Sequence, residues 1–431
     1  MPVDSRTRAV SVIFISVALL VVASNLQTSL LSLRAGLEGF REESIGMFMS
    51  AFFLGFTGGS VLTLRFLRSV GYIRTFAALA SVASVVVLLH GLVINPAFWA
   101  LFRFIYGLCY AGLVLIVESW LNQETSPEDR GRVLGVYGLL FMVGAGFGQL
   151  ALTVAPVEGL VLFVVVSIVL SLALVPPSLL RIDEPPVLPY TRFGIPEVVR
   201  FSPLGAAAVV AAGLVGSVFW SLTPRVVHLL GLDPRWVAIT MSVGVGGGVM
   251  LQWPLGRLSD TVDRRLVILS AAVGGIAASV ALALISASGR PPVPLLLLCM
   301  AAFGGFVLPL YSLALAHIND HLPRQDLVPA AATVVLLFGL AATGGPIAAS
   351  LLLRATGPAG VFIYTSVVLT IFVLVARVRL QLRPPLQRPA KRVFQAVPRT
   401  THLAARFIHH RGRTPYRPGD VDHDLGQKET T

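Results

Sequence analysis

Two ionisable residues, Arg103 and Glu118, lie within one long apolar run of the chain. An ionised side chain in the hydrocarbon region of a membrane is costly, so each is a candidate for a functional role. In a helix, an offset of 15 residues rotates the side chain by about 60° and moves it by about 22 Å, so both can face one cavity. Arg103 could bind an anion or act as a structural ion. Glu118 could carry a proton or form a salt bridge at a gate.

The sequence contains none of the motifs that would indicate an enzyme. HExxH, GxSxG and P-loop patterns are absent, and neither Lys391 nor Lys428 lies in an apolar segment. Cys109 and Cys299 lie in apolar runs without the spacing of a metal or redox site, so we interpret them as small core residues. We therefore expect no catalytic residue, no metal and no cofactor.

The composition indicates a membrane protein. Of the 431 residues, 55% are hydrophobic and 13% charged, about half the charged fraction of a soluble domain. Segments of about 20 apolar residues can each cross a bilayer as a helix, and they predict an all-α polytopic protein with twelve transmembrane helices. The twelve are 10–31, 44–66, 72–94, 97–121, 132–154, 159–179, 204–226, 236–256, 266–288, 293–317, 328–352 and 359–377.

The arginines predict the orientation of these helices. With a cytoplasmic N-terminus, the inside loops hold 14 arginines and the outside loops six, which obeys the positive-inside rule. We therefore expect a multi-pass protein of the cytoplasmic (inner) membrane with both termini in the cytoplasm. Twelve of the 33 basic residues follow residue 376, so the net charge of +12 largely reflects the C-terminal tail and does not indicate nucleic-acid binding.

The breaks between apolar segments predict four regions. Residues 1–179 and 204–379 would each form a six-helix bundle, and 180–203 would be a cytoplasmic linker. Residues 380–431 are rich in Arg, Pro and His without periodicity, which predicts a disordered basic tail. The tail could be a solvated topology signal, or it could bind anionic lipid headgroups.

An internal repeat relates the two bundles. A shift of 197 residues, without gaps, superposes polar residues and glycines that lie at helix ends and packing positions. Because the shift spans six crossings, the halves have the same orientation, and two such bundles can enclose a cavity near the midplane. This geometry is typical of transport by alternating access. The matches are Gly59 with Gly256, Arg68 with Arg265, Gly107 with Gly304, Asn122 with Asn319, Asp129 with Asp326 and Gly148 with Gly345.

Several motifs resemble a known family. The run from Gly256 to Arg265, GRLSDTVDRR, resembles the loop signature of the major facilitator superfamily, and Arg103 in LFRFIYG resembles its helix-4 arginine. The stretches VESWLNQETSPEDRGRVLGVYGLL and LYSLALAHINDHL are similar to the YcaD-like branch of bacterial permeases. The resemblance covers about residues 1–380. It implies a monomeric secondary transporter of a small solute in the lipid bilayer, driven by a proton gradient.

The loop motif leads to a gate hypothesis. In the family, an acidic residue in each half approaches a helix N-terminus of the other half, and Asp260 keeps this character while Arg68 replaces the first-half acid. We predict a charge-paired cytoplasmic gate, and the alternative is that these arginines contact lipid and water. The predicted pairs are Asp260 with Arg130 or Arg132 and Arg68 with Asp320 or Asp326, beside the motif residues Gly256, Arg264 and Arg265.

Polar and aromatic residues on the cavity-facing helices of the family are candidate cavity liners. Each could equally hold helices together by hydrogen bonding. We interpret His90 and His317, near predicted span ends, as wetted interfacial residues. The first-rank candidates are Asn25, Gln27, Tyr110, Trp220 and Tyr311, and the second-rank candidates are Gln149, Gln252 and Trp253.

These observations favour a secondary active transporter that works by alternating access, and the family resemblance implies that it is coupled to protons. An apolar, aromatic cavity with few charges favours amphipathic or weakly charged solutes and hence export. The alternative is an uptake symporter or facilitator of a small organic anion, attracted by Arg103. A membrane-embedded enzyme or a scaffold is a further alternative, which no motif in the sequence supports.

Overall fold

The computed structural model describes residues 5–126, 129–179, 194–289, 291–323, 326–382 and Phe394. These residues form helices and short connections, and no strand occurs among them. Twelve of the helical segments are long and apolar enough to cross a membrane, which confirms the predicted number.

The first six crossings alternate in direction along the chain. The last of them is interrupted, so that a short helix follows α6. The elements are α1 (Ser5–Leu37), α2 (Glu42–Val70), α3 (Tyr72–Leu92), α4 (Pro96–Glu124), α5 (Arg130–Leu150), the 3₁₀ turn η1 (Ala151–Thr153), α6 (Val161–Leu172) and α7 (Val175–Ser178).

The second six crossings repeat this pattern after a short helix, α8 (Ile195–Phe201), within the predicted linker. The remainder of the linker, 180–193, lies outside the described residues. The elements that follow are α9 (Pro203–Ser221), α10 (Thr223–Leu229), α11 (Pro234–Thr261), α12 (Arg264–Ala287), α13 (Val293–Val307), α14 (Leu310–Asp320), α15 (Leu327–Thr356) and α16 (Ala359–Leu382).

Polar caps and prolines determine where several helices begin. Asn95 accepts hydrogen bonds from the backbone amides at the start of α4, and Asp233 does the same for α11. A proline follows each cap, at the first helical position, where a backbone amide would make no hydrogen bond within the helix. Asn95 and Asp233 lie two and three residues before the helix starts expected from hydropathy.

Two predicted spans of the second half are also broken in the structure. The segment 204–226 divides into α9 and α10 next to Pro224, and the segment 293–317 divides into α13 and α14 at Pro309. Proline removes a helical hydrogen bond and its ring crowds the preceding turn, so a break at these positions has a local cause. Beyond the spans, α16 continues to Leu382, three residues into the predicted tail. Apart from these residues and Phe394, the tail lies outside the described residues.

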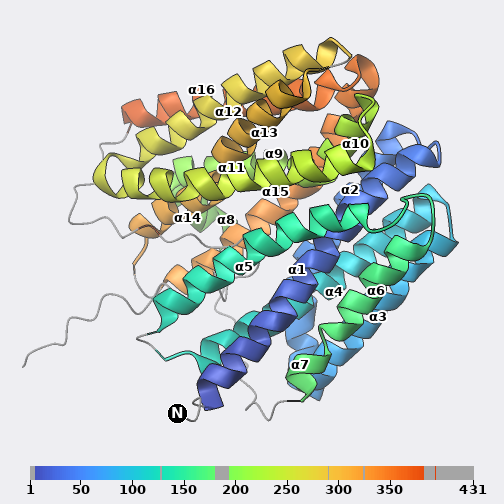
Figure 1. The fold of residues 1–431 in the computed structure, drawn as a ribbon. Helices are drawn as coiled ribbons and strands as arrows, with labels where there is room; N and C mark the ends of the chain where they lie inside the picture. The colour runs from blue at the N-terminus through green and yellow to red at the C-terminus, as the bar shows by residue number, and fades with distance from the viewer. Residues whose placement is uncertain are drawn as a thin grey trace, which may run out of the picture.

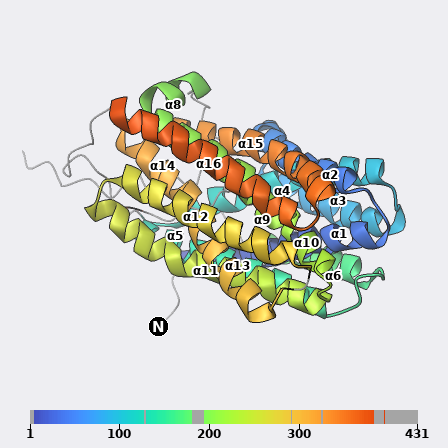
Figure 2. The same cartoon turned by 90° about the horizontal axis from the view of Figure 1, so that it is seen from above.

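The helices form two groups that lie side by side along the length of the molecule. Figure 1 shows α1 to α7, in blue to green, as one group and α9 to α16, in yellow-green to red, as the other; in Figure 2, seen from above, α11, α12 and α16 of the second group lie in front. The groups meet where α2 packs on α15, α5 on α11, and α1 on α9 and α10. Two six-helix bundles of like orientation, the predicted fold class, are confirmed.

Glycines related by the 197-residue shift lie where corresponding pairs of helices approach each other closely in the two halves. A Cβ atom on Gly107 of α4 would collide with the backbone of α2, and one on Gly304 of α13 would collide with the backbone of α11. Likewise, Gly148 allows α5 to approach α1, and Gly345 allows α15 to approach α9. The repeated glycines therefore permit the same close helix contacts in both halves.

The two ends of the helix bundle differ in which helix ends they carry. The terminal face is the end at which α1 begins at Ser5 and α16 ends at Leu382. The opposite face is the end at which α1 finishes at Leu37 and α2 begins at Glu42. Because successive crossings alternate in direction, α5 and α15 begin at the terminal face and α11 ends there.

Candidate functional site

A cavity of about 510 Å³ lies between the two halves. This volume falls within the range of small-molecule sites. Its wall is formed by α1, α2, α4 and α5 of the first half and by α9, α11, α14 and α15 of the second. The stretch from Leu134 to Met142, in the first part of α5, and the stretch from Val249 to Trp253, in the last part of α11, contribute to the wall. The cavity therefore extends toward the terminal face.

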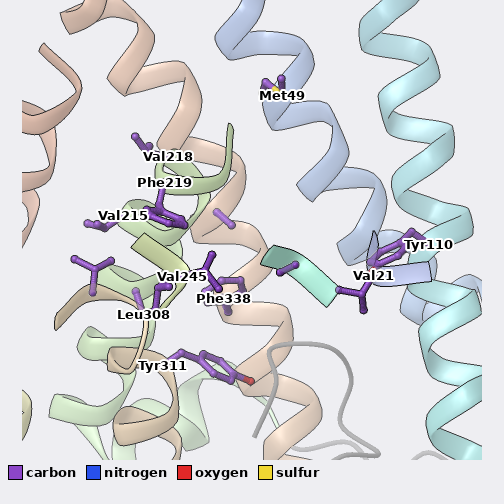
Figure 3. Packing of buried hydrophobic residues seen from close by; sticks show 14 of the residues in the cluster. Val21, Met49, Tyr110, Val215, Val218, Phe219, Val245, Leu308, Tyr311 and Phe338 are labelled. Atoms are coloured by element: carbon purple, nitrogen blue, oxygen red, sulfur yellow. The ribbon is translucent and has the colours of Figure 1, made fainter. Parts of the chain in front are cut away.

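Aromatic side chains form much of this wall. Phe52, Phe53 and Phe56 come from α2, Trp220 from α9 and Phe338 from α15. Figure 3 shows Tyr110 beside Val21 on the first-half side and Phe338 near Leu308 on the second-half side. The surface offered to a solute is thus largely apolar and aromatic.

The structure places three first-rank candidates on this wall and two away from it. Asn25, Tyr110 and Trp220 line the cavity, as do Gln252 and Trp253 of the second rank. The other three candidates are not among the residues that line it. Gln27 is fully buried, Tyr311 packs its ring edge-on against Phe338, and Gln149 accepts a hydrogen bond of 2.5 Å from the Ser29 hydroxyl.

Arg103 borders the cavity but is fully buried. Its Nη2 atom contacts the sulfur of Met49 at 3.8 Å, and its guanidinium carbon lies 4.5 Å from the centre of the Phe52 ring. The Nε and Nη1 atoms have no hydrogen-bond partner, and no carboxylate lies within 4.0 Å, among the residues that the structure describes. Arg103 is therefore a buried cation with no counter-ion in the described part of the chain.

Glu118 occupies a different environment, away from the cavity wall. Its side chain is fully buried, and Oε1 accepts a hydrogen bond of 2.6 Å from the hydroxyl of Tyr137 on α5. This bond joins α4 to α5 within the first half. The structure does not bring Arg103 and Glu118 into one cavity.

The interpretation of the two histidines as wetted interfacial residues is wrong. The side chain of His90 is fully buried, with Nδ1 2.8 Å from the carbonyl oxygen of Val86 and its ring packed against Trp99. His317 is 5% exposed, and its ring lies against that of His321. Neighbouring helices cover both span ends, which hydropathy along one helix does not reveal.

Ion pairs between the halves close the opposite face. Arg225 of α10 binds Glu42 at the start of α2, with N–O distances of 2.8 and 3.1 Å. Arg354 near the end of α15 pairs with Glu43. The hydroxyl of Ser32 also donates a hydrogen bond of 2.6 Å to the backbone oxygen of Ser221, across the same boundary. In the sequence, Arg225 and Arg354 stand out only as loop charges, and nothing there indicates that they pair with the neighbouring residues Glu42 and Glu43.

At the terminal face, the ion pairs formed among the described residues lie within the second half. Arg264 binds Asp260 at 2.9 Å and Asp320 at 3.1 Å, and Arg265 pairs with Asp263. The loop motif is thus an ion-pair network that links α11, α12 and α14.

Among the side chains that the structure describes, none of the predicted gate pairs is formed in this conformation. Arg68 and Arg132 are exposed and have no ion pair with any residue that the structure describes, and Asp326 likewise pairs with none of them. The side chain of Arg130 lies outside the described part. Because the halves are joined at the opposite face here, the gate remains a prediction for a conformation that is closed at the terminal face.

Phe394 reaches the cavity from the C-terminal segment. Its backbone amide donates a hydrogen bond of 2.8 Å to Oδ1 of Asp260. Its ring occupies the space above Gly256, where a Cβ atom would collide with it, and lines the cavity. No sequence pattern around residue 394 indicated this contact.

Comparison with known proteins gives a consistent result. The family model of the Major Facilitator Superfamily matches residues 9–311 and 206–416. The chain is 26% identical over 350 residues to YcaD of Escherichia fergusonii, an uncharacterised MFS-type transporter, covering 81% of this chain and 90% of that protein. It is 24% identical over 353 residues to YcaD of Escherichia coli O6:K15:H31, with the same coverage.

Solved structures share the fold at low sequence identity. The nucleoside transporter NupG superposes with a TM-score of 0.70 at 12% identity, over 88% of this chain and 100% of that one. A D-xylose-proton symporter superposes with a TM-score of 0.68 at 14% identity, over 89% and 99% of the two chains.

Proposed function

The chain belongs to the Major Facilitator Superfamily and is a membrane transporter similar to its YcaD-like branch, and from this premise we propose that it exports a small amphipathic solute by proton-coupled alternating access. The observation that carries the proposal is the aromatic cavity between two halves that ion pairs join at one face only. A solute in this cavity is covered at the opposite face and approaches from the terminal face.

The terminal face is the cytoplasmic face in this proposal. Fourteen arginines in the loops at this face against six at the other support the assignment through the positive-inside rule. The conformation described above is then inward-facing. To release solute outside, the bonds of Arg225 and Arg354 to α2 must break, and the terminal face must close.

Export is favoured by the chemistry of the wall. Phe52, Trp220 and Phe338 offer apolar surface to a solute that partitions into the bilayer, and Asn25 and Gln252 offer hydrogen bonds that orient it. Among the described residues that line the cavity, Arg103 is the only charged one. A cavity of this kind suits amphipathic solutes better than strongly hydrated ones.

Proton coupling in this proposal involves Glu118. The carboxyl group is fully buried and bonded to the hydroxyl of Tyr137, so it can accept that bond as a carboxylate or share it as an acid. Because α5 also contributes to the cavity wall and packs on α11, a change of protonation at Glu118 acts on a helix at the boundary between the halves.

The proposal is tested in proteoliposomes that contain the purified protein and a pH-sensitive dye. A panel of amphipathic solutes is added with and without an imposed proton gradient. We expect solute-dependent proton movement opposite to solute movement. Proton and solute movement in the same direction would instead identify an uptake symporter, and solute movement without protons would identify a facilitator. No response to any solute, with a known proton-coupled transporter as positive control, would contradict the proposal.

A second candidate function is uptake or facilitated passage of a small organic anion. It is favoured by the buried guanidinium of Arg103, which has no counter-ion among the described residues. The two candidates differ in the direction of solute movement, which the same assay measures.

A further inference from the structure

We infer that the cavity contains a subsite for the anionic group of an amphipathic organic anion, which pairs with Arg103 while the apolar body of the solute lies against the aromatic wall. The inference rests on the proposed transport function and adds the charge class of the solute. It is independent of the direction of transport.

The positive charge of the Arg103 guanidinium is not neutralised by any carboxylate among the described residues. A buried cation is stable when it is paired and hydrogen-bonded. Here the guanidinium lies 3.8 Å from the Met49 sulfur, 4.5 Å from the centre of the Phe52 ring and 6.0 Å from that of the Tyr106 ring, and none of the three carries a negative charge. Nε and Nη1 keep their hydrogen-bonding capacity within the described part of the chain. An anionic group is the ligand that would satisfy both the charge and the free N–H groups.

A second buried arginine in the same protein provides the contrast. Arg264 is 1% exposed, as deeply buried as Arg103, but two carboxylates neutralise it: Asp260 at 2.9 Å and Asp320 at 3.1 Å. The fold thus neutralises a buried arginine where its role is to join helices. Only Arg103 borders the cavity, and it is the one without a carboxylate partner among the described residues.

The position of Phe52 supports the same pairing. Its ring lies 4.5 Å from the guanidinium carbon of Arg103, and both residues line the cavity. An apolar group bound against Phe52 would therefore bring an attached anionic group close to the cation. The apolar body of the ligand would then lie between Tyr110 of the first half and Trp220 of the second, both of which line the cavity.

The test measures binding rather than transport, in purified protein held in nanodiscs of uncharged lipid. Three ligands with one apolar body are compared by calorimetry: 4-phenylbutyrate, its neutral amide and 4-phenylbutylamine. The same comparison is made with phenylacetate, indole-3-acetate and toluenesulfonate and their neutral amides. We expect at least one anion to bind about tenfold more tightly than its amide, which corresponds to about 1.4 kcal/mol. The amine should bind more weakly than its amide.

Three variants assign the preference to Arg103. Arg103→Met should bind the anion and the amide with equal affinity, whereas Arg103→Lys, which keeps the charge, should retain part of the preference. Arg235→Gln removes the same charge from an exposed position outside the cavity wall and should bind like the wild type. Each variant is first checked for a single symmetric peak in size-exclusion chromatography.

Several outcomes would overturn the inference. They are equal binding of anion and amide by the wild type, tighter binding of the amine, an anion preference that survives in Arg103→Met, and no binding of any anion in the panel. The wild-type comparison decides the matter even if Arg103→Met does not fold. None of these results would affect the proposed proton-coupled export, which is tested separately by the directions of solute and proton movement in the proteoliposome assay.

Discussion

Arg225 and Glu42 join the two halves of the protein at the opposite face. Both Nε and Nη2 of the arginine donate to the same carboxylate oxygen, at 3.1 and 2.8 Å, and the two side chains are only 12% and 17% exposed. The guanidinium lies against Gly36 at the end of α1, where a Cβ atom would collide with it. Three helices, α1, α2 and α10, thus meet at one contact between the halves.

We predict that Arg225→Gln shifts the protein toward the conformation that is open at the opposite face. A partly buried ion pair of this kind contributes about 1 kcal/mol, so the equilibrium should move about fivefold. The measurement is the rate of maleimide labelling of a cysteine introduced at Ser32, which is fully buried beside Ser221 in the closed contact. Arg41→Gln is the matched control, because Arg41 is 73% exposed and its ion pair among the described residues is with Glu43 of its own half. Equal labelling rates in the two variants would contradict the prediction.

Replacement of Arg103 by Ala should abolish transport while membrane insertion stays intact. The reason is that Arg103 is the only charged residue among the described residues that line the cavity. Transport is measured in proteoliposomes, and insertion by the yield of monodisperse protein from membranes. A well-expressed variant that transports at the normal rate would reduce Arg103 to a packing residue.

Replacement of Glu118 by Gln should remove the dependence of transport on the proton gradient. The amide can still bond to the Tyr137 hydroxyl but cannot gain or lose a proton in the relevant range. The dependence of the initial rate on pH is compared with that of Tyr137→Phe, which removes the hydrogen bond and keeps the carboxyl group. If Glu118→Gln has the pH profile of the wild type, the residue serves only to join α4 to α5.

Removal of Phe394 from the cavity should speed the entry of solute from the terminal face. A chain ending after Leu382 loses the ring that lies above Gly256 and the amide that bonds to Asp260. A chain ending after Pro398 keeps both and is the matched control, and Phe394→Ala removes the ring alone. We expect a rise of the initial rate of about twofold to tenfold, in proportion to an opening cost of about 0.4–1.4 kcal/mol. Identical rates in the three variants and the wild type would show that the contact does not restrict entry.

Charge reversal should reveal the predicted gate at the terminal face. Arg68→Glu should impair transport, and the second change Asp326→Arg should restore part of it, because the pair would form only when this face closes. Asp320 is the less suitable partner, since it already binds Arg264 at 3.1 Å and its reversal would break that network. Transport rates of the single and double variants form a double-mutant cycle. Absence of rescue would leave Arg68 as an arginine that contacts lipid and water.

Some residues of the cavity wall could be predicted from the sequence, because hydropathy marks their helices clearly. Asn25, Tyr110 and Trp220 line the cavity as expected, since the helix that each occupies follows from hydropathy and the family resemblance. Gln27 comes from the same helix as Asn25 but points elsewhere and is fully buried. An offset of two residues rotates a side chain by about 200° around a helix, so the choice between them depends on a packing angle that hydropathy does not specify.

The sequence by itself determined the twelve crossings, the parallel repeat and the glycines at which helices approach closely. The physical reason is that a helix needs about 20 apolar residues to cross the lipid, and that the backbone within the lipid must satisfy its own hydrogen bonds. Only the tertiary structure decided which charged residues meet. Glu42 and Arg225 are 183 residues apart, and Arg264 binds Asp320 while Arg103 binds no described carboxylate. Such pairings depend on the angle between the two bundles and on the rotation of each helix about its own axis. Local sequence preferences determine neither of these two quantities.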